Sequence, residues 1–334
     1  MDAPSPTRES ATNRRAFIGS VAGGLLAAQG TAFGQSASKV PRIGVLGNTD
    51  ASAWDGFRQG MRDLGYVDGR NVAIDWRWAN GIAAKYPELA TELLQLKVDL
   101  LVTSSTPATL AAKQATRSVP IVMLNSAYPD KIGLVESLSH PGGNVTGFSN
   151  VTTELGGKRL ELLREIAPGV SRLALLWNPD NPVEVIGHRE SLANAAAVGV
   201  ELLSIEVRSP SDHAAAFDAV VAGRANALHA NGNPVNFKNF QLIVDFALGR
   251  RLPSSFEERN FVAAGGLLSY APSYADTYRR GAVYVDKILK GAKPGDLPIQ
   301  QPTRFEFVIN LKTAQALGLS VPRSLQLRAD EVIQ

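Results

Sequence analysis

The amino-acid sequence predicts an α/β protein with two similar lobes, each a parallel sheet flanked by helices, and a ligand cleft between them. Its 334 residues, 45% of them hydrophobic and 19% charged, are typical of a globular chain with two domains. From residue 41 onward, short apolar runs alternate with helical patterns, which predicts parallel strands joined by right-handed crossovers. The Gly-, Asn- and Thr-rich stretch at 141–153 interrupts this alternation, which then starts again. We therefore expect the chain to cross between two lobes there.

The elements of the first lobe follow from apolar runs and helical spacing. Strands are expected at 42–47, 71–79, 98–104 and 119–125, and helices at 52–65, 84–97 and 107–117. The last of these helices follows the stretch "VTSSTPA". Thr106 is expected to be its N-cap, and Pro107 its first helical residue, where no N–H is needed.

The second half repeats the alternation, and its helix and strand at 188–207 resemble those at 57–76 as a weak internal repeat. Strands are expected at 172–178, 200–207, 226–231, 252–256 and 265–272, and helices at 155–167, 183–198, 211–222, 235–249 and 274–290. Two α/β lobes of similar construction fit this pattern better than one larger sheet.

Residues 1–34 are predicted to be a cleaved export signal. Arg14 and Arg15 precede a short, uncharged, Gly- and Ala-rich apolar run that ends at the cleavage tripeptide 32–34. The paired arginines match the twin-arginine export pattern, with the general secretory route as the alternative. The run is weakly hydrophobic for a membrane anchor, and the chain has no cysteine to carry a lipid. We expect the mature protein to be periplasmic.

Composition and motifs argue against several classes of function. The absence of cysteine excludes disulfides, thiolate nucleophiles and cysteine metal sites. The formal net charge of +3 includes no basic block, so nucleic-acid binding has no support. The sequence contains no HExxH, GxSxG, GxGxxG or Walker A motif, and its four histidines form no cluster. We expect no catalytic residues, no metal and no cofactor.

Candidate ligand-binding residues are those at the carboxyl ends of the predicted strands, where parallel sheets bind ligands. Most are neutral hydrogen-bonding side chains, and each alone could be an ordinary turn or cap residue. Three hydroxyls at a helix N-terminus suit a carboxylate or phosphate, and acidic members suit an ammonium group. The candidates are Asn48, Asp50, Ser104, Ser105, Thr106, Asn125, Ser126, Tyr128, Asn178, Asn231, Asn233, Glu257 and Tyr270.

Several longer stretches resemble one known family. They include "FRQGMRDLGYVDGRNVAIDWRWA", "GLVESLSHPGGNVTGFSN", "GGKRLELLREIAPGV" and "AVYVDKILKGAKPGDLPIQQPTRFEFVINLKTAQALGL", and the likeness extends over nearly all of 42–334. The sequence resembles the exported substrate-binding proteins of ABC transporters, in the family that includes tryptophan- and tyrosine-binding members. The resemblance implies a type I periplasmic binding protein fold, with three crossings between the lobes and no catalysis.

The resemblance also implies how the chain is divided. Lobe 1 would take residues 40–148 and roughly 274–292, and lobe 2 residues 149–273. The C-terminal segment, 293–334, would cross between the lobes once more.

In related amino-acid binders the hydroxyl-rich loop holds the ligand carboxylate, and that loop corresponds here to Ser104, Ser105 and Thr106. Two pocket positions depart from the family. Tyr128 stands where many relatives have the Asp of an Asp-Pro pair, and the loop from Asn231 to Asn233 differs from the Asp-Pro or Asp-Asn common there.

The resulting prediction is a monomeric periplasmic solute-binding protein that closes on an amino acid or small carboxylate by hinge motion and delivers it to a membrane permease. Ser105 and Thr106 would hold the carboxylate, and Glu257 or Asp50 the ammonium group. Alternatives are a ligand-sensing subunit for a membrane receptor, a periplasmic α/β hydrolase, or a transcriptional regulator on the same scaffold. The export signal argues against the regulator, and the missing nucleophile–base pair against the hydrolase.

Overall fold

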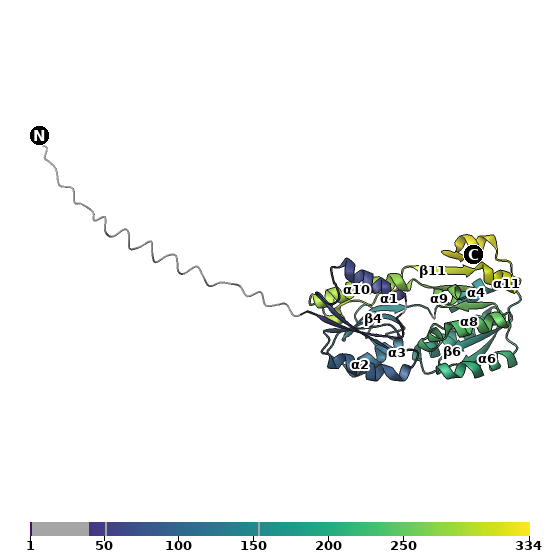
Figure 1. The fold of residues 1–334 in the computed structure, drawn as a ribbon, viewed down its shortest axis with the longest axis horizontal. Helices are drawn as coiled ribbons and strands as arrows, with labels where there is room; N and C mark the ends of the chain where they lie inside the picture. Colours follow the sequence, from purple (N-terminus) through teal and green to yellow (C-terminus); the bar gives the residue numbers. More distant parts are fainter. Residues whose placement is uncertain (2–39, 51, 153) are drawn as a thin grey trace. The chain divides into compact units, whose positions relative to one another are not determined.

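The structure is a computed structural model that describes residue 1 and residues 40–50, 52–152 and 154–334. Apart from its first residue, the predicted export signal at 1–34, with Arg14 and Arg15, lies outside the described residues. Residues 40–334 form one unit, whose strands gather into two sheets, each in a lobe of its own (Figure 1). No helix in the described ranges is long and apolar enough to cross a membrane.

The first sheet has the strand order β2-β1-β3-β4-β5, and all its strands are parallel, as predicted. The strands are β1 (Arg42–Gly47), β2 (Ala73–Trp78), β3 (Leu100–Thr103), β4 (Ile121–Ala127) and β5 (Val145–Asn150). The helices that pack on it are α1 (Ala53–Asp63), α2 (Tyr86–Gln95), α3 (Thr106–Ala115) and α10 (Tyr274–Leu289). Helices α1 and α10 cover one face of the sheet, and α2 and α3 cover the other (Figure 1).

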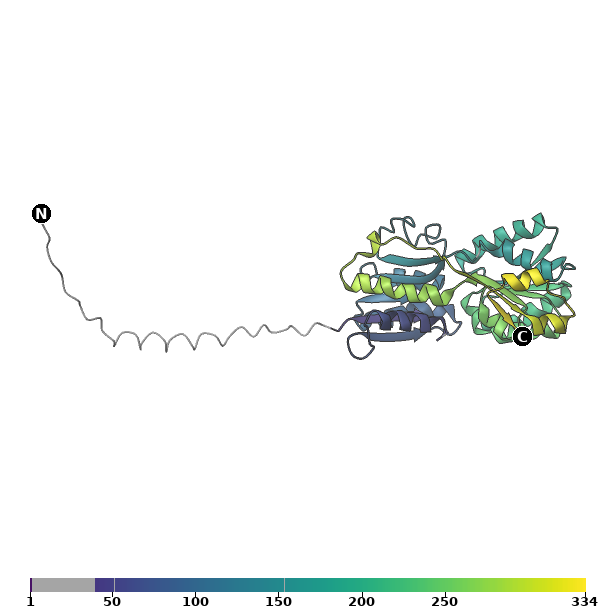
Figure 2. The same ribbon diagram turned by 90° about the horizontal axis from the view of Figure 1, so that it is seen from above.

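Helix α10 comes from the far end of the chain and lies beside α1 (Figure 2). Two glycines of α1 allow this close approach. A Cβ at Gly56 would lie 2.3 Å from the carbonyl oxygen of Ala275, and one at Gly60 would lie 2.5 Å from that of Arg279. Neither position can carry a side chain unless the two helices separate.

The second sheet has the order β12-β11-β10-β9-β8-β6-β7. Its strands are β6 (Arg172–Trp177), β7 (Glu201–Glu206), β8 (Ala227–Ala230), β9 (Ser254–Phe256), β10 (Leu268–Pro272), β11 (Phe305–Asn310) and β12 (Glu331–Ile333). Its helices are α4 (Gly156–Ile166), α5 (Pro182–Ala197), α6 (His213–Ala222), α7 (Pro234–Lys238), α8 (Phe240–Gly249), α9 (Arg259–Ala263), α11 (Leu311–Leu317) and α12 (Arg323–Arg328).

Two features of the second lobe differ from the sequence prediction. Strand β11 pairs antiparallel to β10, so the sheet is mostly rather than wholly parallel. The expected helix at 235–249 is two helices, α7 and α8, because the backbone at Asn239 leaves helical geometry (φ −110°, ψ 24°). The Nδ2 of Asn239 donates to the carbonyl of Val235 at 2.9 Å and helps to close the first of them.

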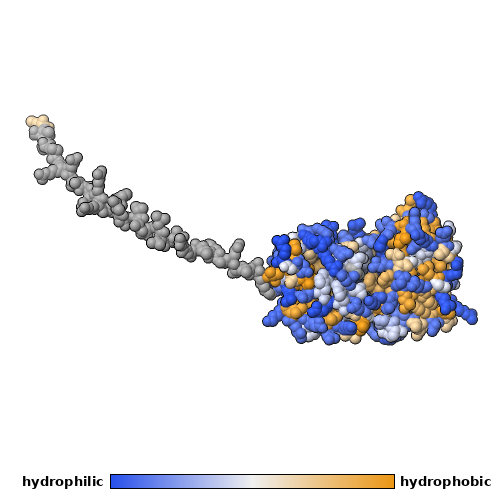
Figure 3. All heavy atoms as spheres, in the orientation of Figure 1, coloured by the Kyte–Doolittle hydropathy of each residue, from blue (hydrophilic) through white to orange (hydrophobic). Residues whose placement is uncertain are grey.

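The chain passes between the two sheets three times. It leaves the first sheet after β5, returns through the start of α10, and goes back along 298–304 to enter β11. On this last passage, the backbone of Gln300 is hydrogen-bonded to Gly147 and Ser149 of β5 at 2.9 Å each. On the face shown in Figure 3, hydrophilic residues are spread over both lobes, with hydrophobic ones scattered between them.

Candidate functional site

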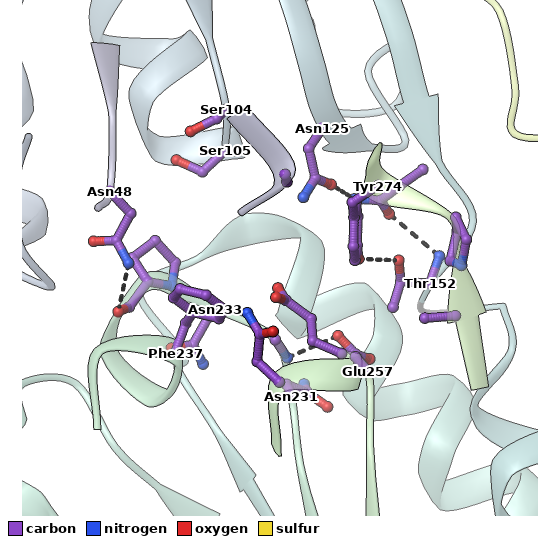
Figure 4. A pocket seen from close by; sticks show the side chains of 18 of the residues that line it. Asn48, Ser104, Ser105, Asn125, Thr152, Asn231, Asn233, Phe237, Glu257 and Tyr274 are labelled. Carbon is purple, nitrogen blue, oxygen red and sulfur yellow. Dashed lines mark hydrogen bonds between the residues drawn. The ribbon is translucent and has the colours of Figure 1, made fainter. Parts of the chain in front are cut away.

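A cavity of about 210 Å³ lies between the two lobes and is lined by residues of both. It opens at the carboxyl ends of the strands, where parallel sheets bind ligands. Drug-sized ligands occupy pockets of roughly 300–1,000 Å³, so this cavity suits a smaller solute. Eight of the thirteen predicted residues line it: Asn48, Ser104, Ser105, Thr106, Asn125, Asn231, Asn233 and Glu257, most of them labelled in Figure 4.

The first-lobe wall presents the hydroxyls that precede and begin α3. The N-cap of this helix is Ser105, one residue earlier than predicted, because its backbone is extended (φ −167°, ψ 160°). Its Oγ accepts from the N–H of Ala108 at 3.3 Å and donates to the hydroxyl of Tyr86 at 3.4 Å. The hydroxyl of Ser105 is therefore committed to the protein itself.

Thr106 keeps more freedom to bind a ligand. Its Oγ1 lies 2.9 Å from the Oγ of Ser126, and either atom can be the donor. This pair has two hydroxyl protons and one mutual hydrogen bond, so one proton remains for another acceptor. The positive end of the α3 dipole adds to the attraction for an anion at this wall.

Two amides complete the first-lobe wall. The Nδ2 of Asn48 donates to the carbonyl of Pro234 in the second lobe at 3.0 Å, and its Oδ1 accepts from the N–H of Gly81 at 2.7 Å. Asn48 thus joins the two lobes at the edge of the cavity. The Oδ1 of Asn125 accepts from the side-chain amide of Asn150, next to the first crossing.

The second-lobe wall contains Glu184, a residue that the sequence analysis did not single out. It lies in the first turn of α5 and is 4% exposed. Its Oε2 accepts from the side chains of Asn231 and Asn233, both at 3.1 Å, and Asn181 donates to its Oε1 at 3.0 Å. Burial raises the pKa of Glu184 to about 7, against these donors. The predicted asparagines therefore hold a buried carboxylate.

Glu257 is part of a buried ion pair. The Nη2 of Arg159, a side chain that is 2% exposed, lies 2.8 Å from its Oε1, and the N–H of Gly232 donates to its Oε2 at 2.8 Å. His229 lies behind this pair, where burial and then the charge of Arg159 lower its pKa to about 3. It is neutral and contacts Ser255 through Nδ1 at 2.9 Å, so it is a core histidine outside the main cavity.

The remaining lining includes aromatic rings and two more carboxylates. Trp54, Phe237, Tyr274 and Tyr278 offer apolar faces, Glu258 follows Glu257 at the end of β9, and Glu306 lies on β11. The hydroxyl of Tyr274 lies 3.2 Å from that of Thr152 (Figure 4). Sequence reasoning missed these residues, although Glu258 adjoins a predicted one.

Five predicted residues do not line the cavity, and each has a different role. Asp50 pairs with Arg58 at 2.6 Å on the surface, and Ser126 lies behind Thr106. The backbone N–H of Asn178 donates to Glu184 at 2.9 Å, while its side chain accepts from Asp180.

The other two are aromatic. Tyr128 packs against Val183 of α5, and its hydroxyl donates to Glu190 of the same helix at 2.7 Å. Tyr270 points to the opposite side of β10 from its cavity-lining neighbour Ser269, because successive strand residues face opposite ways. Its ring packs against Phe305. Trp177, at the end of β6, does not line the cavity and stacks on His188.

The described residues contain no group of three or more His, Cys, Asp or Glu side chains placed to hold a metal ion. The lining instead combines hydroxyls, amides, carboxylates and aromatic faces, which is the chemistry of a binding site for a small polar solute.

Two α/β lobes joined by three crossings, with a polar cavity between the carboxyl ends of their strands, define a solute-binding protein of the type I periplasmic kind. Residues 45–333 match the family model described as ABC transporter substrate binding protein, and the chain belongs to that family.

A relative from Clostridioides difficile, named tyrosine-binding protein, is 27% identical over 280 residues, which cover 83% of this chain and 80% of that protein. Among solved structures, a conserved domain protein from Vibrio cholerae has a TM-score of 0.82 at 27% identity and covers 88% of this chain and 100% of its own. A streptococcal ABC domain in complex with L-Trp has a TM-score of 0.82 at 28% identity, covering 88% and 99%. The family and these relatives place the chain among substrate-binding proteins.

Proposed function

We propose that this protein is the periplasmic solute-binding component of an ABC importer and that it closes on an amino acid or small carboxylate between its lobes. The observation that carries the proposal is the interlobe cavity, with hydroxyls and a helix N-terminus on one wall and carboxylates and aromatic rings around the rest. Family membership supports the transport role, and the relatives named for tyrosine and crystallised with L-Trp support an amino acid.

Hinge closure is supported by contacts that exist only when the lobes are together. Tyr128 of the first lobe donates to Glu190 of the second at 2.7 Å, and Asn48 donates to the carbonyl of Pro234 at 3.0 Å. Such contacts stabilise the closed form, and a ligand that touches both walls would stabilise it further. A closed, loaded protein is the form we expect a membrane permease to recognise.

In this proposal the ligand carboxylate lies at the start of α3, where Thr106 supplies a hydroxyl proton and the helix dipole supplies positive potential. The aromatic faces of Phe237, Tyr274 and Tyr278 would contact the apolar part of the ligand. The protein would act as a monomer, without a cofactor.

Isothermal titration calorimetry with the twenty amino acids and a set of small carboxylates tests the function. We expect at least one of these compounds to bind, and the Thr106→Val variant to bind it about 10- to 100-fold more weakly, because a hydrogen bond to a charged group contributes roughly 1.5–3 kcal/mol. Thr91→Val, on the exposed side of α2, is the matched control. Unchanged affinity in Thr106→Val would refute the carboxylate position, and binding of none of the compounds would refute the ligand class.

A further inference from the structure

The charges around the cavity are unbalanced. Arg259 is the one Lys or Arg among the described lining residues, and both its Nε and Nη2 lie 2.6 Å from the carboxylate of Glu331. The buried cation behind the wall, Arg159, is paired with Glu257. Among the described residues that line the cavity, no cation is therefore left to neutralise the other carboxylates of this wall.

Glu258 is a cavity-lining carboxylate without a partner; Glu306, the other one, acts through its charge on Arg259, whose pKa is raised first by Glu331 and then by Glu306. Within the described residues Glu258 forms no hydrogen bond and no ion pair, although it is partly buried and lines the cavity. It occupies the N-cap position of α9, where an acidic side chain ordinarily accepts from the helix backbone, yet it makes no such hydrogen bond. Its carboxylate is thus left available to the cavity.

The position of Glu258 is set by a glycine and by the tyrosines of α10. A Cβ on Gly232 would lie 3.2 Å from the Oε2 of Glu257 and 3.4 Å from the Oε1 of Glu258, so glycine leaves room for both carboxylates. Burial and then the charge of Glu258 raise the pKa of both Tyr274 and Tyr278. Glu258 therefore lies close to two cavity-lining rings that remain neutral and cannot balance its charge when it is ionised.

A second acceptor on the same wall is also unsatisfied. Asn181 lines the cavity and is 7% exposed, and its Nδ2 is committed to Glu184. Its Oδ1 has no hydrogen-bond partner in the described part of the chain. A buried acceptor without a partner is destabilising, and a ligand N–H could satisfy it.

We propose that Glu258 receives a protonated amine of the ligand, so that the cavity takes an amino acid and rejects a carboxylic acid that lacks the amine. This inference rests on the proposed function and narrows its ligand class. The ligand would lie with its carboxylate towards the start of α3 and its ammonium group towards Glu258, which would replace Glu257 and Asp50 as the ammonium partner. Burial of Glu258 beside the charge of Glu257 raises its pKa to about 8, so in the empty cavity it is largely protonated at neutral pH, and an ammonium group of the ligand would take the place of that proton.

The test uses calorimetry on the purified protein with amino acids and their deaminated counterparts, such as L-tryptophan with 3-indolepropionate and L-tyrosine with 3-(4-hydroxyphenyl)propionate. In the unmodified protein, the amino acid should bind about 100-fold more tightly than its counterpart. In Glu258→Gln, affinity for the amino acid should fall about 10- to 100-fold while affinity for the counterpart stays or rises. Glu258→Asp, which keeps the charge, should retain part of the preference.

Glu88→Gln, an exposed residue of α2 with the same change of charge, is the control and should leave both affinities unchanged. Circular dichroism verifies that each variant is folded. If amino acids bind and Glu258→Gln leaves the preference for the amine intact, the assignment of Glu258 is wrong and the proposed function stands. If the deaminated counterparts bind as tightly as the amino acids, the restriction of the ligand class to amino acids is wrong. If neither class binds, the proposed function itself fails.

Discussion

The two walls of the cavity differ in how their polar groups are held. On the first-lobe wall, Ser105 and Thr106 are neutral, and their hydroxyls form hydrogen bonds mainly to nearby groups of the same lobe. On the second-lobe wall, Glu184 and Glu257 are buried carboxylates held by groups from several elements. A neutral wall costs little to bury, whereas a charged wall depends on every partner being present. The second wall should therefore dominate both stability and selectivity.

The largest effect is expected when the buried ion pair is broken. Arg159→Met leaves Glu257 buried without its cation and should destabilise the protein by about 3–5 kcal/mol, which chemical denaturation measures. The exposed pair of Arg208 and Asp180 provides the comparison, and Arg208→Met should change stability by less than about 1 kcal/mol. Equal losses in the two variants would show that the charged wall has no special dependence on its partners.

A smaller effect is expected from pH. Burial raises the pKa of Glu184 to about 7 and of Glu258 to about 8, so the folded protein holds protons that the unfolded chain releases above about pH 4.5. Their stabilising effect is complete below pH 4.5 and is lost as pH rises through 7 and 8. His229 acts in the opposite direction, but only below about pH 6.5, where the unfolded state binds its proton.

Between pH 6.5 and 8, the pH dependence of stability therefore comes from the two carboxylates and not from His229. The ligand-free protein should lose stability there by up to about 1 kcal/mol per pH unit, and this slope should be smaller in Glu258→Gln. Several groups face Glu258: the carboxylate of Glu257, with Arg159 behind it, and the hydroxyls of Tyr274 and Tyr278. Thermal unfolding at several pH values measures the slope. A stability that rises across this window in both proteins would contradict the charged wall.

The smallest effect is expected where the walls meet. Tyr128→Phe removes the hydrogen bond to Glu190 and therefore favours the open form. The affinity for every ligand should fall about 2- to 5-fold, and the ratio of affinities between ligands should stay the same. Tyr66→Phe is a matched control, since the Tyr66 hydroxyl donates to Asp286, which lies on the same lobe. A change in the ranking of ligands would place Tyr128 in the binding site after all.

The sequence predicted the neutral wall better than the charged one, for a physical reason. Strand ends and helix starts are visible in local patterns, so Ser105, Thr106 and Asn125 were found. Glu184 was missed because a glutamate in the first turn of a helix is usually solvated, and only tertiary packing buries this one. Tyr274 was missed because a crossing between the lobes brings it to the cavity, and local sequence periodicity does not predict the path of that crossing.

Two predicted residues do not line the cavity for reasons that the sequence pattern could not reveal. Asp50 follows a strand end as expected, but Arg58, in the second turn of the next helix, pairs with it. Tyr270 lies on the correct strand and faces the wrong side of it, because the pattern could not fix the register of a short strand. The fold itself, two α/β lobes with parallel first-lobe strands, was predicted because apolar runs and helical spacing recur along the whole chain.

The most direct test of the account is a crystal structure of the complex with whichever amino acid binds in calorimetry. We predict that the ligand ammonium nitrogen lies within hydrogen-bonding distance of the Glu258 carboxylate, and its carboxylate at Thr106 and the start of α3. A ligand bound with its carboxylate against the second-lobe wall, or with its amine away from Glu258, would contradict the account.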